Sequence, residues 1–220
     1  MAVIKHKEQR VGVFLDAQNL YHSAKNIHQG RVNFENVLND ALAGRQLVRA
    51  IAYVITTETG EEKGFFDALT KIGIETKTKD LQIFSSGSKK ADWDVGLAID
   101  AVKLASKLDV VVIASGDGDF IPLIEYLKMN GCQVEVISFG KSASSKLKEV
   151  ADDFVDMDEN AGRYVMGGRH NSNRDTRDNR DNREFTKKNE QRVHSDEEKS
   201  SGKQDQGKVG GMRKVIRKLR

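Results

Sequence analysis

One short segment limits the possible folds more than any other: the run Val110–Ala114 (VVVIA), which is apolar at every position. A strand with one solvated face alternates apolar and polar residues, whereas a strand of a parallel sheet is covered by helices on both faces and loses that alternation. The run therefore favours a parallel sheet between two layers of helices. Other runs of strand length are Val11–Leu15, Leu47–Ile55, Ile72–Thr78, Val134–Phe139 and Phe154–Met157.

Helical patterns lie between these runs. Phe34–Leu42 has apolar residues at positions 34, 37, 38, 41 and 42, which form one stripe on a helix. The other helical patterns cover Gly64–Leu69, Asp94–Leu108 and Phe120–Met129, and the pair Asn130-Gly131 is expected to end the last of them in a left-handed cap. Strands that alternate with helices predict βαβ units and a three-layer α/β/α fold with a mostly parallel sheet.

Charge divides the chain into two parts of opposite sign. The net charge of the 220 residues is +3, but residues 160–220 carry 17 Lys and Arg against 9 Asp and Glu, about +8, which leaves about −5 for residues 1–159. An acidic body repels phosphate unless a cation lies between them, whereas a basic tail attracts nucleic acid.

The composition also predicts the domain organisation. We expect an N-terminal extension over residues 1–10, a domain over 11–158, a disordered low-complexity linker over 159–207 and a basic amphipathic segment over 208–220. Asn171–Glu184 (NSNRDTRDNRDNRE) has too few apolar residues to fold, and it is either a solubilising spacer or an RNA-attracting segment. In the last segment, Met212, Val215, Ile216 and Leu219 have helical spacing among Lys and Arg, which suits contact with RNA, an acidic protein or a membrane surface.

The cellular compartment is expected to be the cytoplasm. The first ten residues are too charged for a signal peptide, and no apolar run approaches the roughly 20 residues that span a bilayer. The single cysteine, Cys132, excludes an intramolecular disulfide and a cysteine-rich zinc site, and we expect it to be a buried, reduced thiol. The oligomeric state stays open, a homo-oligomer included.

Acidic residues follow two of the expected strands at the point where each strand ends. Asp16 follows Val11–Leu15, and Ser115-Gly116-Asp117-Gly118-Asp119 follows Val110–Ala114. Ligands of open parallel sheets bind outside the carboxyl ends of the strands, so we expect these carboxylates to lie close together. Neighbouring carboxylates repel one another unless a cation neutralises them, and hard oxygen ligands select Mg²⁺ or Mn²⁺. The pattern predicts a metal site that activates water at a phosphodiester.

Each of these residues also has a purely structural explanation. Asp16 suits a solvated strand end as well as a metal site, and Asp94, at the start of a helix, suits a helix cap better than a metal ligand. A Gly-Asp turn explains Asp117 and Asp119 less well, although Asp119 is also placed to cap the helix that follows. Asn19 is equally suited to the start of a helix. Trp93 is expected in the core rather than stacked on a base, and none of the five histidines is expected to be a ligand or a base.

Three segments together resemble one known family. They are Val13–Leu20 (VFLDAQNL), Trp93–Asp100 (WDVGLAID) and Ser115–Leu123 (SGDGDFIPL), and they resemble the NYN domain family in its LabA-like branch. The resemblance covers roughly residues 10–158. It implies a PIN-like (Rossmann-like) nuclease fold and RNA cleavage assisted by Mg²⁺ or Mn²⁺. It also implies a metal site built from Asp16, Asp94, Asp117 and Asp119, with Asn19 beside it.

The expected function is therefore that of a metal-dependent ribonuclease, an endonuclease that hydrolyses RNA with metal-activated water. The expected catalytic and metal-binding residues are Asp16, Asp94, Asp117 and Asp119, and the expected substrate contacts are Asn19, Ser115 and Gly116. The alternative is a non-catalytic RNA-binding or regulatory protein that uses the same fold and the basic tail. A phosphatase of the haloacid dehalogenase type needs a second aspartate two residues after the first, and Gln18 at that position argues against it.

Overall fold

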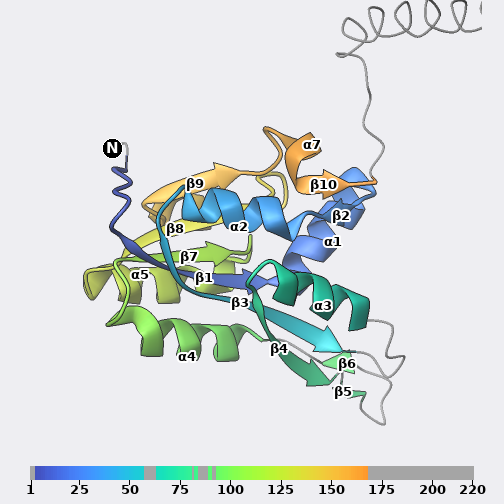
Figure 1. Cartoon of the computed structure of the whole chain (residues 1–220), viewed down its shortest axis with the longest axis horizontal. Coiled ribbons are helices and arrows are strands. Elements are labelled where there is room, and N and C mark those ends of the chain that lie inside the picture. The colour runs from blue at the N-terminus through green and yellow to red at the C-terminus, as the bar shows by residue number, and fades with distance from the viewer. Residues whose placement is uncertain (1–2, 57–62, 81, 84–88, 91–92, 168–220) are drawn as a thin grey trace, which may run out of the picture. The chain divides into compact units, whose positions relative to one another are not determined.

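The structure, a computed structural model, describes residues 3–56, 63–80, 82–83, 89–90 and 93–167. Six strands, all paired in parallel, form its central sheet (Figure 1). In spatial order they are β4 (Glu75–Asp80), β3 (Gln46–Thr56), β1 (Arg10–Asp16), β7 (Val110–Ala114), β8 (Gln133–Ser138) and β9 (Asp153–Asp156). This sheet confirms the predicted fold class.

Helices cover both faces of the sheet, as Figure 1 shows. On one face lie α1 (Ala17–His28), α2 (Phe34–Leu42) and α3 (Lys63–Lys71), and on the other lie α4 (Asp94–Ala105), α5 (Ile121–Met129) and α6 (Ser145–Val150). Strand β7 contributes to both cores, because Val110 and Val112 pack toward α1–α3 while Val111 and Ile113 pack toward α4–α6. All five residues of β7 are buried, which explains why its sequence shows no alternation.

The path of the chain creates a crevice beside β1. From β1 the chain moves outward to β3 and β4, and it then returns to β7 on the other side of β1 before continuing to β8 and β9. Such a reversal of strand order is where open α/β sheets bind their ligands. The register pairs Leu15 with Ala114, so that Asp16 and Ser115, the next residues, emerge at the same edge.

Several local predictions differ from the structure. Helix α1 was not among the predicted helices, because seven of its twelve residues are polar and its apolar stripe is therefore weaker than that of α2. The strand expected at Ile72–Thr78 begins at Glu75, since Gly73 turns the chain after α3 with a φ of +84°. Helix α4 ends at Ala105 rather than at Leu108. The predicted left-handed cap after α5 is confirmed at Gly131, whose φ is +87°.

The ordered domain continues beyond residue 158, so the prediction of a disordered linker from residue 159 is wrong for residues 161–166. Helix α7 (Ala161–Tyr164) leads into β10 (Val165–Met166), which pairs antiparallel with β2 (Arg31–Val32). Tyr164 is buried, and its hydroxyl donates a hydrogen bond of 2.6 Å to Asp40. The rest of the expected linker and the basic segment 208–220 lie outside the described residues. The remaining elements are the short antiparallel strands β5 (Gln82–Ile83) and β6 (Lys89–Lys90).

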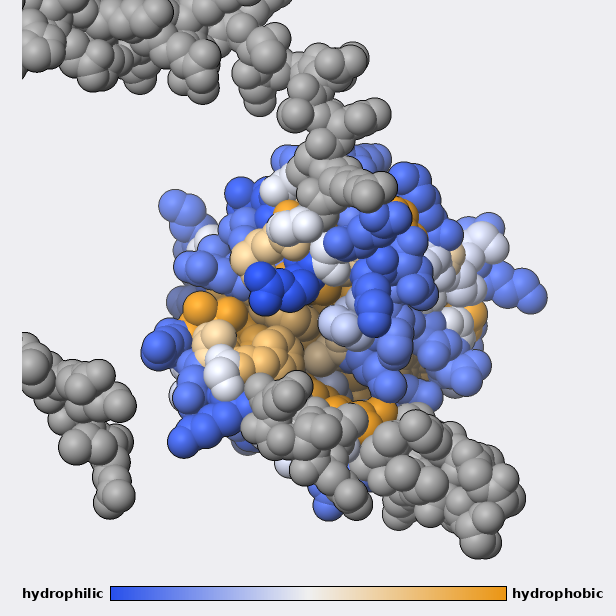
Figure 2. Space-filling model, turned by 90° about the vertical axis from the view of Figure 1, so that its right-hand side faces the viewer, coloured by the Kyte–Doolittle hydropathy of each residue, from blue (hydrophilic) through white to orange (hydrophobic). Residues whose placement is uncertain are grey.

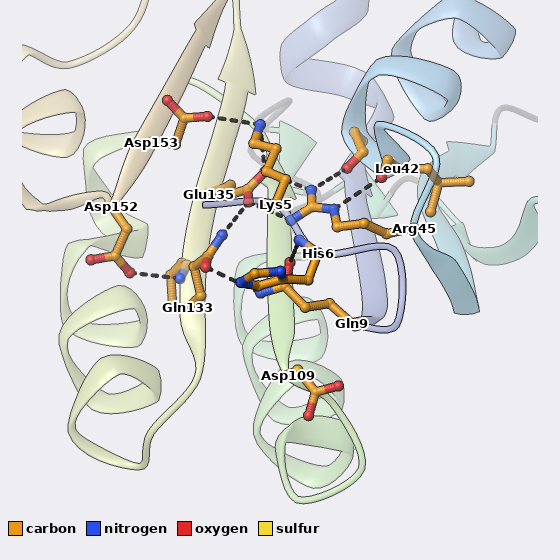
Figure 3. Close-up of polar contacts among 12 residues, drawn as sticks. Lys5, His6, Gln9, Leu42, Arg45, Asp109, Gln133, Glu135, Asp152 and Asp153 are labelled. Atoms are coloured by element: carbon orange, nitrogen blue, oxygen red, sulfur yellow. Dashed lines mark hydrogen bonds and ion pairs between the residues drawn. The ribbon is translucent and has the colours of Figure 1, made fainter. Parts of the chain in front are cut away.

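A buried ion pair organises the opposite, amino-terminal edge of the sheet (Figure 3). The guanidinium of Arg45 donates to both carboxylate oxygens of Glu135 at 2.6 and 2.8 Å, and the two side chains are 1% and 2% exposed. Arg45 also donates to the carbonyls of Ala41 and Leu42, which end α2, and Lys5 adds a second cation 3.2 Å from Glu135. The pair therefore connects the end of α2 to β8.

Two other predictions concern the single cysteine and the membrane. Cys132 is free and buried, as expected. Within the part of the chain that the structure describes, no helix combines the length and the apolar character that crossing a membrane requires.

Candidate metal centre

The centre is built where β1 and β7 end side by side. Asp16, the last residue of β1, caps helix α1 by accepting a hydrogen bond of 3.0 Å from the backbone N–H of Asn19. Its other carboxylate oxygen accepts a hydrogen bond of 3.1 Å from the hydroxyl of Ser115. Burial raises the pKa of Asp16; the hydrogen bonds from Asn19 and Ser115 oppose this shift, and the nearby charge of Asp117 adds to it.

The loop after β7 is held by the same residues. The backbone N–H of Gly116 donates to the amide oxygen of Asn19 at 3.0 Å, and that of Asp117 donates to the hydroxyl of Ser115 at 3.2 Å. A Cβ on Gly116 would lie 2.9 Å from the Cα of Ala143, so only glycine fits there. Asn19, Ser115 and Gly116 therefore position the loop.

This arrangement changes what two of the expected substrate contacts can do. Ser115 and Gly116 are both buried, and Ser115 has no exposed surface. A phosphate contact by the hydroxyl of Ser115, which the sequence suggested, is incompatible with that position. Asn19 is half-buried and lines the pocket described below, so it remains a candidate for contact with substrate.

Three carboxylates converge at this loop. Asp94, Asp117 and Asp119 each offer one oxygen, and the three oxygens lie within 4.8 Å of one another. Asp117 lies in the loop and Asp119 in the 3₁₀ helix η1 (Gly118–Phe120). Asp94 is the first residue of α4, which packs on the face of the sheet that α5 and α6 also cover. We call these three residues the carboxylate triad.

Helix capping accounts for these residues differently from the sequence-based expectation. Asp117, rather than Asp119, is the capping residue of this segment. It caps η1, because its carboxylate accepts a hydrogen bond of 3.0 Å from the N–H of Asp119. Trp93 occupies the cap position of α4, and Asp94 lies in the first turn of this helix, where a negative charge suits the helix dipole. Asp16 was expected as a fourth ligand of the metal, but it is not a member of the triad. It lines the same pocket, and Ser115 links it to the backbone of Asp117.

A pocket of about 330 Å³ opens beside the triad. Asp16, Asp94 and Asp117 are its acidic lining residues, and the other lining residues come mainly from α1, the end of β3 and Trp93. Figure 2 faces this edge of the sheet and shows apolar surface between hydrophilic side chains. The indole N–H of Trp93 donates to the carbonyl of Val54 at 3.0 Å, which fixes the ring.

Sequence reasoning missed most of the pocket. Gln18, His22 and Asn26 line it from α1, and Tyr53 and Ile55 line it from β3. The available signal was the four-residue spacing of Gln18, His22 and Asn26 directly after Asp16, which places three polar side chains on one face of a helix. The strand residues carried no such signal, because Tyr53 and Ile55 read simply as part of an apolar strand.

The acidic residues and the pocket together define a class of protein. A protein with a parallel sheet between helices and three carboxylates at the carboxyl ends of the strands is an α/β protein with an acidic site. Hard divalent cations suit the oxygen ligands of such a site. A family model of the NYN domain matches residues 10–158, and the chain belongs to this family. The resemblance read from the three sequence motifs is thereby confirmed.

Individual proteins are similar to this chain in sequence or in structure. "Low amplitude and bright protein LabA" of Synechococcus elongatus is 28% identical over 162 residues, which cover 70% of this chain and 86% of that protein. The uncharacterized protein MJ0482 of Methanocaldococcus jannaschii is 26% identical over 155 residues, 69% of this chain and 57% of that protein. A protein of unknown function from Vibrio parahaemolyticus, VPA0982, has a similar crystal structure with a TM-score of 0.67 and 27% identity, covering 74% of this chain and 100% of that one.

Proposed function

We propose that this protein is a cytoplasmic, Mg²⁺- or Mn²⁺-dependent ribonuclease that hydrolyses RNA phosphodiesters at the carboxylate triad. The observation that carries the proposal is the convergence of Asp94, Asp117 and Asp119 within 4.8 Å at the carboxyl edge of the sheet. Membership of the NYN domain family supports it.

The donor set of the triad fits such an ion. It consists of carboxylate oxygens alone among the residues that the structure describes, with no histidine or cysteine in the cluster, and this favours hard cations over zinc or copper. Asp94 and Asp117 are half-buried, and Asp119 is exposed, so one side stays open to water and to a substrate phosphate. A bound Mg²⁺ or Mn²⁺ would supply an activated water and neutralise charge on the phosphodiester.

The surrounding residues have distinct roles in this proposal. The triad would hold the ion, and Asp16 adds a carboxylate to the lining of the same pocket. Ser115 connects Asp16 to the backbone of Asp117, and Asn19 connects α1 to Gly116, so both act as positioning residues. A cation bound there would offset the repulsion between the acidic body and an anionic substrate.

A cleavage assay tests the proposal. Labelled RNA is incubated with the full chain and Mn²⁺ or Mg²⁺, and in parallel with Asp94→Asn and Asp117→Asn. We expect cleavage by the wild type, loss of cleavage in EDTA and a decrease of about 100-fold or more in both variants, since a catalytic metal contributes several kcal/mol to the transition state.

Asp67→Asn is the matched control, because Asp67 is an exposed aspartate on α3 outside the pocket. It should cleave at the wild-type rate. RNA that stays intact with every metal would contradict the proposal, and so would equal cleavage by the wild type and the triad variants. RNA affinity without cleavage, unaffected by the aspartate substitutions, would instead identify a non-catalytic RNA-binding protein.

A further inference from the structure

The pocket beside the triad has two walls of different chemistry. One wall is apolar and aromatic, with Trp93 and Ile55, which are half-buried, and Tyr53, which is almost fully buried. The rings of Trp93 and Tyr53 meet edge to face with centroids 5.5 Å apart, and Trp93 is further held by its hydrogen bond to Val54. The hydroxyl of Tyr53 is not suited to act as an acid. It donates a hydrogen bond of 2.8 Å to Asp100, and burial and that bond raise its pKa.

The second wall is a row of hydrogen-bonding side chains on α1. Gln18, His22 and Asn26 are spaced by four residues, so they lie above one another on one helix face, and all three are exposed. Amide groups offer both donors and acceptors, and an imidazole offers one of each in its neutral form. None of the three carries a fixed charge of the kind that recognises a phosphate or a carboxylate.

A planar, uncharged ring with polar edges matches both walls. Nucleobases stack on aromatic side chains and form hydrogen bonds along their edges, which is how proteins recognise unpaired nucleotides. The pocket volume of about 330 Å³ is within the range of roughly 300–1,000 Å³ that is usual for small-ligand sites. Because Asp94 and Asp117 line this pocket and also belong to the triad, a base held here would have its own phosphate close to the triad.

We propose that this pocket binds one unpaired nucleobase of an RNA strand, next to the phosphodiester that reaches the carboxylate triad. The proposal rests on the ribonuclease function proposed above and makes it more specific. A base in a duplex is stacked and paired on all sides, so the pocket selects single strands, loops and ends rather than continuous double helix. Gln18, His22 and Asn26 are the residues that would set any preference among bases.

The protein carries its own probe for this proposal, because Trp93 is the only tryptophan in the 220 residues. Its fluorescence therefore reports on the pocket and not on contacts elsewhere, those of the basic tail included. The full chain with Asp117→Asn is titrated in Mg²⁺ with a single-stranded RNA hexamer, with the same hexamer annealed to its complement, and with an abasic hexamer of equal charge. We expect the single strand to quench Trp93 and the other two to bind about tenfold more weakly or without quenching.

A pair of asparagine substitutions in the same background tests the polar wall. Asn26→Ala should weaken the binding of the single strand about fivefold to tenfold, whereas Asn39→Ala, at an exposed helical position outside the pocket, should leave it unchanged. Both variants should fold, because each replaces an exposed helical residue by alanine. Equal binding by the two variants would contradict a role for this wall.

The outcomes separate this proposal from the ribonuclease function. If RNA is cleaved by the wild type but no RNA quenches Trp93, or if the abasic hexamer quenches as strongly as the RNA, the base pocket is wrong and the ribonuclease stands. If single strands quench Trp93 but no metal supports cleavage by the wild type, the ribonuclease is wrong and the base pocket stands. If a mononucleotide quenches as fully as the hexamer at equal concentration, the pocket serves free nucleotides, and the proposal of an RNA base is overturned.

Discussion

At the scale of single residues, the carboxylate triad concentrates negative charge. Asp94, Asp117 and Asp119 place three oxygens within 4.8 Å, and Asp16 lies close enough to Asp117 for their charges to interact. Like charges at such distances disfavour one another unless a cation is present. The folded protein is therefore expected to be less stable without a divalent ion than with one, and the difference is measurable.

The first prediction concerns this difference. A cation that binds only the folded state at about 100 times its Kd adds about 2.7 kcal/mol to the free energy of unfolding. For a domain of this size that corresponds to an increase in Tm of roughly 5–10 °C. Thermal unfolding should show this increase on addition of Mn²⁺ to the wild type and to Asp67→Asn, but not to Asp94→Asn or Asp117→Asn. An increase that survives both triad substitutions would place the ion elsewhere.

Without metal, the substitution Asp117→Asn should not lower the stability of the fold. In EDTA, Asp117→Asn removes one of the repelling charges, so its Tm should equal or exceed that of the wild type. A lower Tm in EDTA would mean that the carboxylate of Asp117 stabilises the fold mainly as the cap of η1, where it accepts the hydrogen bond from Asp119.

At the scale of elements, the buried pair of Arg45 and Glu135 shows how the amino-terminal edge of the sheet is held. The pair is almost fully buried, and the guanidinium also satisfies two carbonyls at the end of α2. Removing one partner of a buried pair leaves the other charge without compensation, and this typically costs about 3–5 kcal/mol. Arg49 and Glu75 form a comparable two-bonded pair between β3 and β4, but their side chains are 40% and 52% exposed.

These two pairs give a matched prediction. Glu135→Gln should lower the free energy of unfolding by about 3–5 kcal/mol, whereas Glu75→Gln should lower it by less than about 1 kcal/mol, because exposed pairs are screened by water. Urea unfolding of the two variants measures both values. The double variant Arg45→Met, Glu135→Leu should be more stable than Glu135→Gln alone, and equal losses at Glu135 and Glu75 would contradict the argument from burial.

At the scale of the whole molecule, the question is what the basic C-terminal part adds. The chain divides into one unit over residues 1–170 and a second over 171–220. The change in composition at Asn160 suggested an earlier boundary, but α7 and β10 continue the first unit. Arg163 and Tyr164 both contact Asp40 of α2, and the backbone N–H of Asn33 donates to the carbonyl of Tyr164 at 2.7 Å.

The last prediction compares two truncations. A chain of residues 1–170 should keep the Tm of the full protein, whereas a chain of residues 1–159 should lose several degrees, since it lacks the buried Tyr164 and its bonds to α2.

Removal of residues 171–220 should also reduce the dependence of RNA affinity on salt. Fewer cations then contact phosphates, and the slope of log K against log salt scales with their number. Binding isotherms at several salt concentrations measure it, and an unchanged slope for residues 1–170 would remove the tail from RNA binding.

Much of the fold was predictable from sequence because its signals are local. The apolar run of β7 and the apolar stripe of α2 were identified with their observed bounds. Helix α1 was missed because its apolar stripe is weak. The ends of β4 and α4 were misplaced by about three residues, because turns such as the one at Gly73 depend on backbone conformations that the apolar pattern does not encode.

What the sequence by itself determined is that acidic residues follow two buried strands, which places Asp16 and Asp117 at one edge of a parallel sheet. Only the tertiary structure decided which of the acidic residues form the triad and which lie beside it. Asp94 reaches Asp117 and Asp119 because α4 packs against the sheet beside the loop after β7, while Asp16 turns toward Ser115 and the start of α1. The physical reason is that strand ends follow from local patterns, whereas the distance between side chains on different elements is set by packing.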